Sequence, residues 1–190
     1  MKLNLYQKTA IVTVIATLFL IFVGGLVRAA GAGLGCPDWP KCFGTWIPPT
    51  TAEALPSAFD ESQFNVWKTW IEYINRLIGV VIGLLITATF GLSFRYRKSK
   101  PSVFYSSGIA FVLVLVQAWL GGQVVRSGLS EWMITLHMML AMIIVSILLY
   151  AAFQATGDLL RISVGEEFRK RVVTVSSVLL FLTLVQMVLG

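Results

Sequence analysis

Five stretches of this chain are long and apolar enough to cross a lipid bilayer, which leaves little sequence for anything else. They cover roughly residues 9–28, 72–94, 102–124, 132–153 and 172–190. A helix that rises about 1.5 Å per residue needs about 20 residues to cross a hydrocarbon core of ~30 Å. Only 13% of the residues are charged, against about a quarter in soluble domains. The sequence therefore predicts an all-α integral membrane protein, a transmembrane bundle of five helices.

Basic residues are unequally distributed between the two sides of these helices. Ten lie on the side of the N-terminus and five on the other side. The positive-inside rule therefore predicts a cytoplasmic N-terminus, and the net charge of +6 requires no nucleic acid as a partner. The expected organisation is a four-helix bundle over 1–154 with an outer loop at 29–70, a cytoplasmic loop at 155–171, and a further helix at 172–190.

Cys36 and Cys42 are the only cysteines, and both fall in this outer loop. Thiols outside the cytoplasmic membrane meet oxidants, so the pair is expected to form a disulfide. Closing so small a loop contributes roughly 2 kcal/mol in the chain-entropy model. A structural bridge, a redox-active pair and a pair that is reduced to handle metal or heme all remain open at this point.

Internal repeats relate the helices to one another. Residues 115–121 read LVQAWLG and residues 184–190 read LVQMVLG, while GGLVR at 24–28 has a looser counterpart in GGQVVR at 121–126. The repeats predict that alternate helices correspond. Aligning the second and fourth helices on Trp70 and Trp132 then pairs Asn75 with His137.

His137 is the single histidine and lies about 8 Å inside its helix from the outer boundary. An ionisable group at that depth is a candidate functional residue. It either forms a hydrogen bond to a neighbouring helix or binds a heme iron, as imidazoles do in four-helix bundles. A lone histidine cannot assemble a zinc or copper site.

A second polar cluster, Glu72, Asn75 and Arg76, occupies one face of the second helix, because its members are three and four residues apart. The glutamate and arginine either neutralise each other or serve a site. In the second case Glu72 handles protons, and Arg76, Arg28 or Arg126 meets the carboxylates of a porphyrin. All of these residues lie near the outer helix ends.

Three segments carry a resemblance to the heme A synthase family: GGLVRAAGAGLGCPDWPKCFG at 24–44, WIEYINRLIG at 70–79 and TLHMML at 135–140. The resemblance implies an eight-helix, pseudo-symmetric protein of two four-helix bundles in the bacterial cytoplasmic membrane. Its N-terminal bundle oxidises the C8 methyl group of heme O to the formyl group of heme A, for cytochrome oxidase biogenesis. Its second bundle holds a heme b.

The resemblance also assigns roles to residues. Cys36 and Cys42 match the family's outer cysteine pair, Glu72 matches its catalytic glutamate, and His137 matches an iron ligand of the first bundle. Asn75 stands where the family has the other histidine, so the heme here is expected either to be ligated through His137 alone or to be bound unlike the family's, with Asn75 lining the site. The chain is expected to be the first bundle plus one helix of a second, incomplete bundle, so the heme b would lie in a missing half.

Two other classes of protein stay open. A membrane thiol oxidoreductase would cycle Cys36 and Cys42 with substrate proteins, although it usually needs a closer or a second pair. A non-catalytic assembly subunit would use its helices only for packing, with glycine pairs allowing close approach. Expected partners are membrane lipid, the heme O substrate, a heme O synthase and a second copy of the chain.

Overall fold

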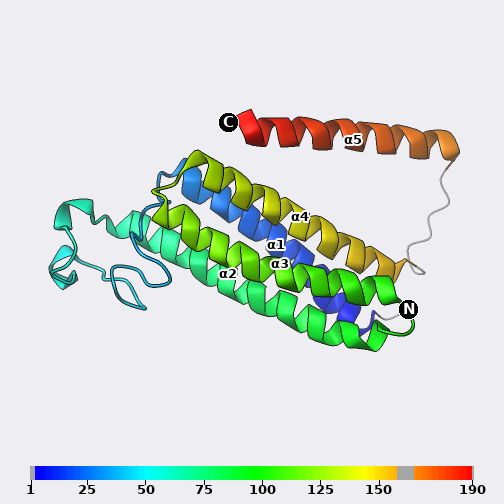
Figure 1. Cartoon of the computed structure of the whole chain (residues 1–190), viewed down its shortest axis with the longest axis horizontal. Helices are drawn as coiled ribbons and strands as arrows, with labels where there is room; N and C mark the ends of the chain where they lie inside the picture. Colours follow the sequence, from blue (N-terminus) through cyan, green and yellow to red (C-terminus); the bar gives the residue numbers. More distant parts are fainter. Residues whose placement is uncertain (1–2, 158–164, 190) are drawn as a thin grey trace.

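The computed structural model describes residues 3–157 and 165–189, and these ranges are helical with no β-strand. The helices before residue 157 pack side by side with a long loop at one end, and the last helix lies outside this bundle (Figure 1). The helices are α1 (Leu5–Ala29), α2 (Val66–Ser93), α3 (Pro101–Arg126), α4 (Glu131–Thr156) and α5 (Glu166–Leu189), with short 3₁₀ turns at Ala52–Ala54, Glu61–Gln63 and Phe94–Tyr96. The all-α bundle that the sequence predicts is confirmed.

Polar residues at the ends of the apolar runs fix where the helices begin. The side chain of Asn4 accepts a hydrogen bond from the backbone of Gln7, whose own side chain accepts one from the backbone of Asn4. Asn65 caps α2 through the backbone N–H of Lys68, and Pro101 starts α3 at a position that needs no N–H donor. Helix α2 therefore begins six residues before the predicted apolar stretch.

The centre of the bundle combines apolar packing with a few paired polar groups. α1 and α3 each pack against both α2 and α4, so α2 and α4 lie diagonally opposite each other. The Tyr6 hydroxyl is 2.8 Å from the Ser107 hydroxyl, and the Thr13 and Thr89 hydroxyls are 2.9 Å apart. Pairing of this kind is needed inside a bilayer, where water cannot satisfy polar groups.

The outer surface of the four helices is apolar. Large side chains that point away from the bundle are exposed along its length, among them Phe22, Leu84, Trp119 and Phe153. Four helices, α1 to α4, have the length and hydropathy to span a membrane within the described residues. An exposed apolar surface of this extent suits lipid and not water, and the chain is a multi-pass membrane protein.

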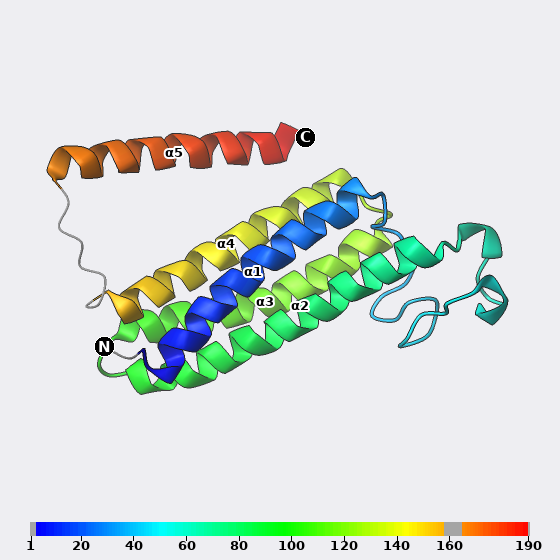
Figure 2. The ribbon, with the colours of Figure 1, turned by 180° about the vertical axis from the view of Figure 1, so that it is seen from behind.

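Helix α5 contains the fifth predicted stretch, except for Gly190, which lies outside the described residues. Its side chains from Glu166 to Thr183 are exposed. Figures 1 and 2 show α5 beside the four-helix bundle, running back towards the end that carries the long loop. The middle of the predicted cytoplasmic loop, residues 158–164, lies outside the described residues.

Candidate functional site

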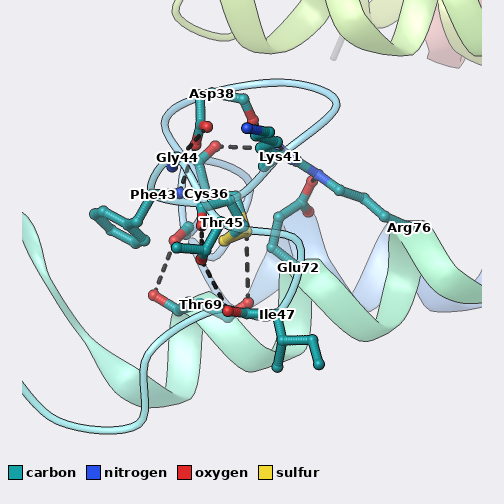
Figure 3. The surroundings of a disulfide bond; sticks show 12 residues. Cys36, Asp38, Lys41, Phe43, Gly44, Thr45, Ile47, Thr69, Glu72 and Arg76 are labelled. Atoms are coloured by element: carbon teal, nitrogen blue, oxygen red, sulfur yellow. Dashed lines mark hydrogen bonds and ion pairs between the residues drawn. A yellow bond between two sulfur atoms is a disulfide. The ribbon is translucent and has the colours of Figure 1, made fainter. Parts of the chain in front are cut away.

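The long loop between α1 and α2, residues 30–65, covers one end of the bundle, which we call the loop end. Cys36 and Cys42 form a disulfide there, with their sulfur atoms 1.99 Å apart, so the predicted bridge is present. Both cysteines are buried, at 0% and 1% exposure. Figure 3 shows the bridged segment lying over α2, from which Glu72 and Arg76 point towards it.

Asp38 and Thr45 hold the bridged segment in its folded shape. The Asp38 carboxylate accepts hydrogen bonds from the backbone N–H groups of Phe43 and Gly44, at 2.6 and 2.9 Å. Cys42 and Thr45 exchange two backbone hydrogen bonds. Phe43 and Gly44 both have positive φ angles, 54° and 73°, and the carboxylate stabilises this tight turn by satisfying both donors.

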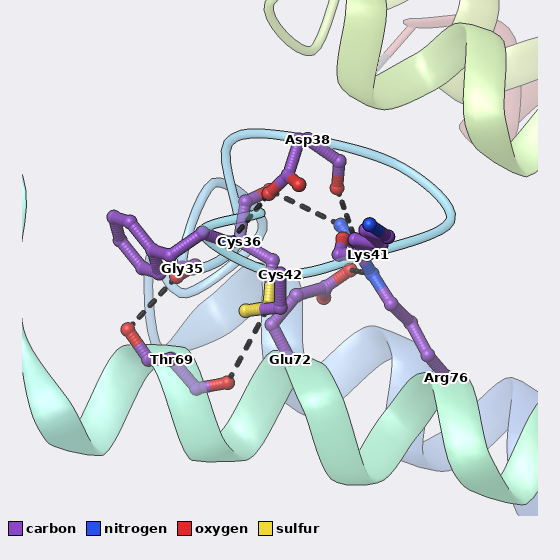
Figure 4. A network of polar contacts seen from close by, with 9 residues as sticks. Gly35, Cys36, Asp38, Lys41, Cys42, Thr69, Glu72 and Arg76 are labelled. Carbon is purple, nitrogen blue, oxygen red and sulfur yellow. Dashed lines mark hydrogen bonds and ion pairs between the residues drawn. A yellow bond between two sulfur atoms is a disulfide. The ribbon is translucent and has the colours of Figure 1, made fainter. Parts of the chain in front are cut away.

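Arg76 connects this segment to α2. Its Nε donates to a carboxylate oxygen of Glu72 at 2.9 Å, and its two terminal nitrogens donate to three backbone carbonyl oxygens of the loop (Figure 4). Those acceptors are Asp38 at 2.7 Å, Lys41 at 3.0 Å and Cys36 at 3.1 Å. Glu72 is only 7% exposed, so the arginine both neutralises a buried carboxylate and joins three loop carbonyls to α2.

A second anchor lies one turn earlier on α2. The Thr69 hydroxyl donates to the backbone carbonyl of Gly35 at 2.8 Å, and Cys36 Sγ lies 3.8 Å from the Thr69 carbonyl oxygen (Figure 4). A disulfide sulfur carries no hydrogen, so the second approach is a van der Waals contact. An added Cβ at Gly35 would overlap the Lys68 carbonyl, which means that only glycine permits the loop to lie this close to the helix.

The loop also touches α3 through Trp39. A Cβ added at Gly122 would lie 3.0 Å from two carbons of the Trp39 ring, so the ring lies directly on the helix backbone at that glycine. The peptide bond between Trp39 and Pro40 is cis. The bridged segment therefore rests on two adjacent helices, α2 and α3, and covers the bundle at the loop end.

His137 faces α3 from the second turn of α4. A Cβ added at Gly121 would lie 3.3 Å from Cε1 of the ring, and the ring nitrogen Nδ1 is buried with no hydrogen-bond partner among the described residues. The Gln117 side-chain nitrogen donates to the backbone carbonyl of His137 at 2.9 Å. The imidazole is thus held at the helix interface with a nitrogen that the protein leaves unpaired.

Asn75 lies on α2, diagonally opposite the helix that carries His137. Its side-chain oxygen is also buried without a partner in the described part of the chain. Arg28 and Arg126 are exposed near the loop-end termini of α1 and α3, and neither forms an ion pair or side-chain hydrogen bond with a described residue. The roles predicted for these residues, and for Glu72 and Arg76, stay predictions.

The His137 side chain, as the structure places it, suits the ligation of a heme iron. One feature supports the fit: the ring nitrogen Nδ1 is buried and lacks a hydrogen-bond partner among the described residues. The donor set matches as well, because an imidazole in an apolar bundle is a usual heme ligand. Over the described residues no three His, Cys, Asp or Glu side chains gather as a metal site.

An apolar groove of about 500 Å³ lies elsewhere, between α2 and α3. Phe90 and Phe104 line it, and both belong to the helix ends far from the loop. Its lining includes none of the candidate site residues. We therefore assign the candidate site to the loop end.

Sequence reasoning missed four residues that organise this site: Asp38, Thr69, Trp39 and Gln117. Asp38 and Trp39 lie within the motif at 24–44, in which only Arg28 and the two cysteines were given roles. Thr69 could have been found three residues before Glu72 on the same helical face. Gln117 is the polar residue that both copies of the LVQxxLG repeat share. This shared glutamine could have marked Gln117 as a candidate site residue.

These features define a class of protein: a multi-pass membrane four-helix bundle whose loop end carries a half-buried histidine and a disulfide-closed loop. The sequence profile of one family, COX15-CtaA, described as cytochrome oxidase assembly protein, matches residues 7–190. The chain belongs to this family.

Three curated relatives are each called heme A synthase. The protein of Shewanella oneidensis is 28% identical over 182 residues, which cover 94% of this chain and 54% of the relative. That of Orientia tsutsugamushi (strain Boryong) is 33% identical over 138 residues, covering 64% and 38%. That of Geobacillus kaustophilus is 30% identical over 137 residues, covering 72% and 37%.

The chain thus spans about half or less of the length of these relatives. No solved structure matches it.

Proposed function

We propose that this chain provides the bundle in which heme O is bound and the C8 methyl group of heme O is oxidised to the formyl group of heme A, for cytochrome oxidase biogenesis. The observation that carries the proposal is His137: it is the only histidine, and it presents a buried, unpaired ring nitrogen at the helix interface. Relatives called heme A synthase cover 94% and 72% of the chain.

His137 would hold the iron of the heme substrate in this proposal. Arg28 and Arg126 would meet the propionates, because both end their helices on the loop side, are exposed and have no carboxylate partner in the described residues. Bound heme supplies the porphyrin whose methyl carbon is oxidised through successive hydroxylations. The bundle would exclude water from it, since the loop covers the loop end through Arg76 and Trp39.

Glu72 would act as the proton-handling carboxylate of the site. It is buried beneath the loop and has Arg76 as its counter-charge. Arg76 already donates to Glu72 and to three loop carbonyls, so contact with a propionate would require it to release one of them. We therefore favour Arg28 and Arg126 over Arg76 as propionate partners.

We further propose that the N-terminus is cytoplasmic and that the long loop lies on the outer side of the bacterial cytoplasmic membrane. The proposal rests on the ten basic residues on the N-terminal side against five on the other. Supply of heme O by a heme O synthase, a heme b in a second bundle, and assembly with a second copy remain predictions.

The experiment is an optical and pigment-extraction analysis of the purified chain, expressed with a source of heme O, beside His137→Ala. Bound heme O or heme A that is lost in the variant would support the proposal. Pigment retained equally by both proteins would contradict it. Helix content by circular dichroism controls for misfolding of the variant.

The thiol-oxidoreductase alternative predicts mixed disulfides through Cys36 or Cys42. Both sulfurs are buried against α2, which leaves a substrate thiolate no direct line of attack without movement of the loop. Trapping of a substrate protein on a single-cysteine variant would favour that alternative over ours.

A further inference from the structure

Two adjacent glycines of α3, Gly121 and Gly122, each contact an aromatic ring from another part of the chain. At Gly121, an added Cβ would lie 3.3 Å from Cε1 and 3.9 Å from Nδ1 of His137. At Gly122 it would lie 3.0 Å from the Trp39 ring. The first distance is tighter than an ordinary van der Waals contact, so even a methyl group at Gly121 would displace the imidazole by a few tenths of an ångström.

Gln117 lies on α3 one helical turn before Gly121 and also contacts His137. Its side-chain nitrogen donates to the His137 backbone carbonyl at 2.9 Å, a bond that crosses from α3 to α4. That carbonyl belongs to a helix and already has a helical N–H as its ordinary donor. The bond from Gln117 is therefore additional to the hydrogen bonds within α4. It fixes the position of residue 137 along α3.

The corresponding glycine pair of α1 provides a comparison inside the same molecule. Gly24 and Gly25 belong to the counterpart motif GGLVR, yet an added Cβ at either would meet nothing within 4 Å. If the glycine pairs served only close helix packing, both pairs would lie against a neighbouring helix. Only Gly121 does so, against the His137 ring of α4, whereas Gly122 lies against Trp39 of the loop.

We propose that Gln117 and Gly121 are positioning residues for His137: Gln117 fixes the backbone of residue 137, and Gly121 fixes the plane and direction of its imidazole. Residues that orient a metal-binding histidine commonly matter to metal affinity by roughly 10-fold or more. This inference rests on the proposed function, because it assumes that heme is the ligand.

The test uses the full chain purified with heme and compares Gly121→Ala and Gln117→Met with the wild-type protein. Gln117→Met removes the donor at nearly constant length and adds no bulk at the histidine, so it stays informative if Gly121→Ala fails to fold. The readouts are heme per protein chain, the electron paramagnetic resonance spectrum of the ferric heme, and its reduction potential. A role in packing alone would leave the last two unchanged.

The controls are Gly25→Ala, which places a methyl group in open space, and Gly122→Ala, which acts on Trp39. We expect Gly121→Ala and Gln117→Met to lower heme affinity by roughly 10-fold and to alter the ferric spectrum. Gly25→Ala should match the wild type, and Gly122→Ala, whose methyl group meets Trp39 and not the histidine, should loosen the loop and alter the spectrum less than Gly121→Ala does.

The outcomes separate the two proposals. If the wild-type chain binds heme and both variants keep its affinity and spectrum, the positioning role is wrong and the proposed function stands. If the wild-type chain binds no heme at all, the proposed function fails, and the positioning role fails with it. If Gly25→Ala changes the spectrum as much as Gly121→Ala does, the effect is not specific to the histidine.

Discussion

Removing Arg76 should destabilise the protein more than any other single change at the loop end. In Arg76→Met, the Glu72 carboxylate, which is 7% exposed, loses its counter-charge. The carbonyls of Cys36, Asp38 and Lys41 lose their donor in the same step. Leaving a buried charge uncompensated costs about 3–5 kcal/mol. The lost loop hydrogen bonds, each worth about 0.5–1.5 kcal/mol, do not add in full to this cost. Water replaces part of them as the loop detaches from α2.

The assay is the free energy of unfolding in mixed micelles, with the rate of disulfide reduction by a water-soluble phosphine as a local readout. Glu72→Gln/Arg76→Met should be less destabilised than Arg76→Met, because the double variant buries no unpaired charge. Both variants should expose the Cys36–Cys42 bridge to reduction, since both lose the loop contacts.

The matched control is Arg171→Met on α5. Arg171 pairs with Glu167 at 3.1 Å and at the same spacing, but the two side chains are 78% and 84% exposed. An exposed helical pair of this kind contributes about 0.3–0.5 kcal/mol. A cost for Arg76→Met that is no larger than the cost for Arg171→Met would refute the reasoning, because burial beneath the loop would then have no energetic consequence.

Three further predictions concern the loop, the site and the core. Gly35→Ala should detach the loop from α2, because the added methyl group overlaps the Lys68 carbonyl, and should speed disulfide reduction, whereas Gly24→Ala, in open space, should not. Asn75→His, if the proposed heme site is correct, should add a second imidazole opposite His137 and convert the ferric heme towards a low-spin spectrum. Thr13→Val should cost about 0.5–1.5 kcal/mol in unfolding free energy, because it removes the 2.9 Å contact with the Thr89 hydroxyl, which still donates to the Leu85 carbonyl.

The helices could be predicted from the sequence because apolar length alone determines them. The four stretches within α1 to α4 were each located, and the structure extends them by six residues at the start of α2, four at the start of α1 and three at the end of α4. A count of bilayer-spanning length does not detect such extensions, because the helix starts are set by caps such as Asn4 and Asn65. The same pattern of spacing placed Glu72 and Arg76 on one helical face, and their 2.9 Å ion pair agrees with it.

The loop contacts could not be predicted, because they join residues that are distant in sequence through backbone groups. Arg76 donates to carbonyls 35 to 40 positions away, and every residue type has a carbonyl. Sequence reasoning left the arginine either to neutralise Glu72 or to meet a ligand, since a charged residue in a membrane helix needs a partner. The structure shows the ion pair with Glu72 and adds acceptors from the loop backbone.

The repeats predicted which helices correspond and could not predict how each copy is used. Gly24–Gly25 and Gly121–Gly122 occupy equivalent places in their motifs, yet only the second pair has rings lying on it. The difference arises outside the repeat, from a histidine on α4 and a tryptophan in the long loop. Because Trp39 and His137 rest on neighbouring residues of α3, a movement of the loop has a short route to the imidazole through one helical backbone. The disulfide and the Arg76 contacts, which hold the loop still, would in that way also hold the histidine in place.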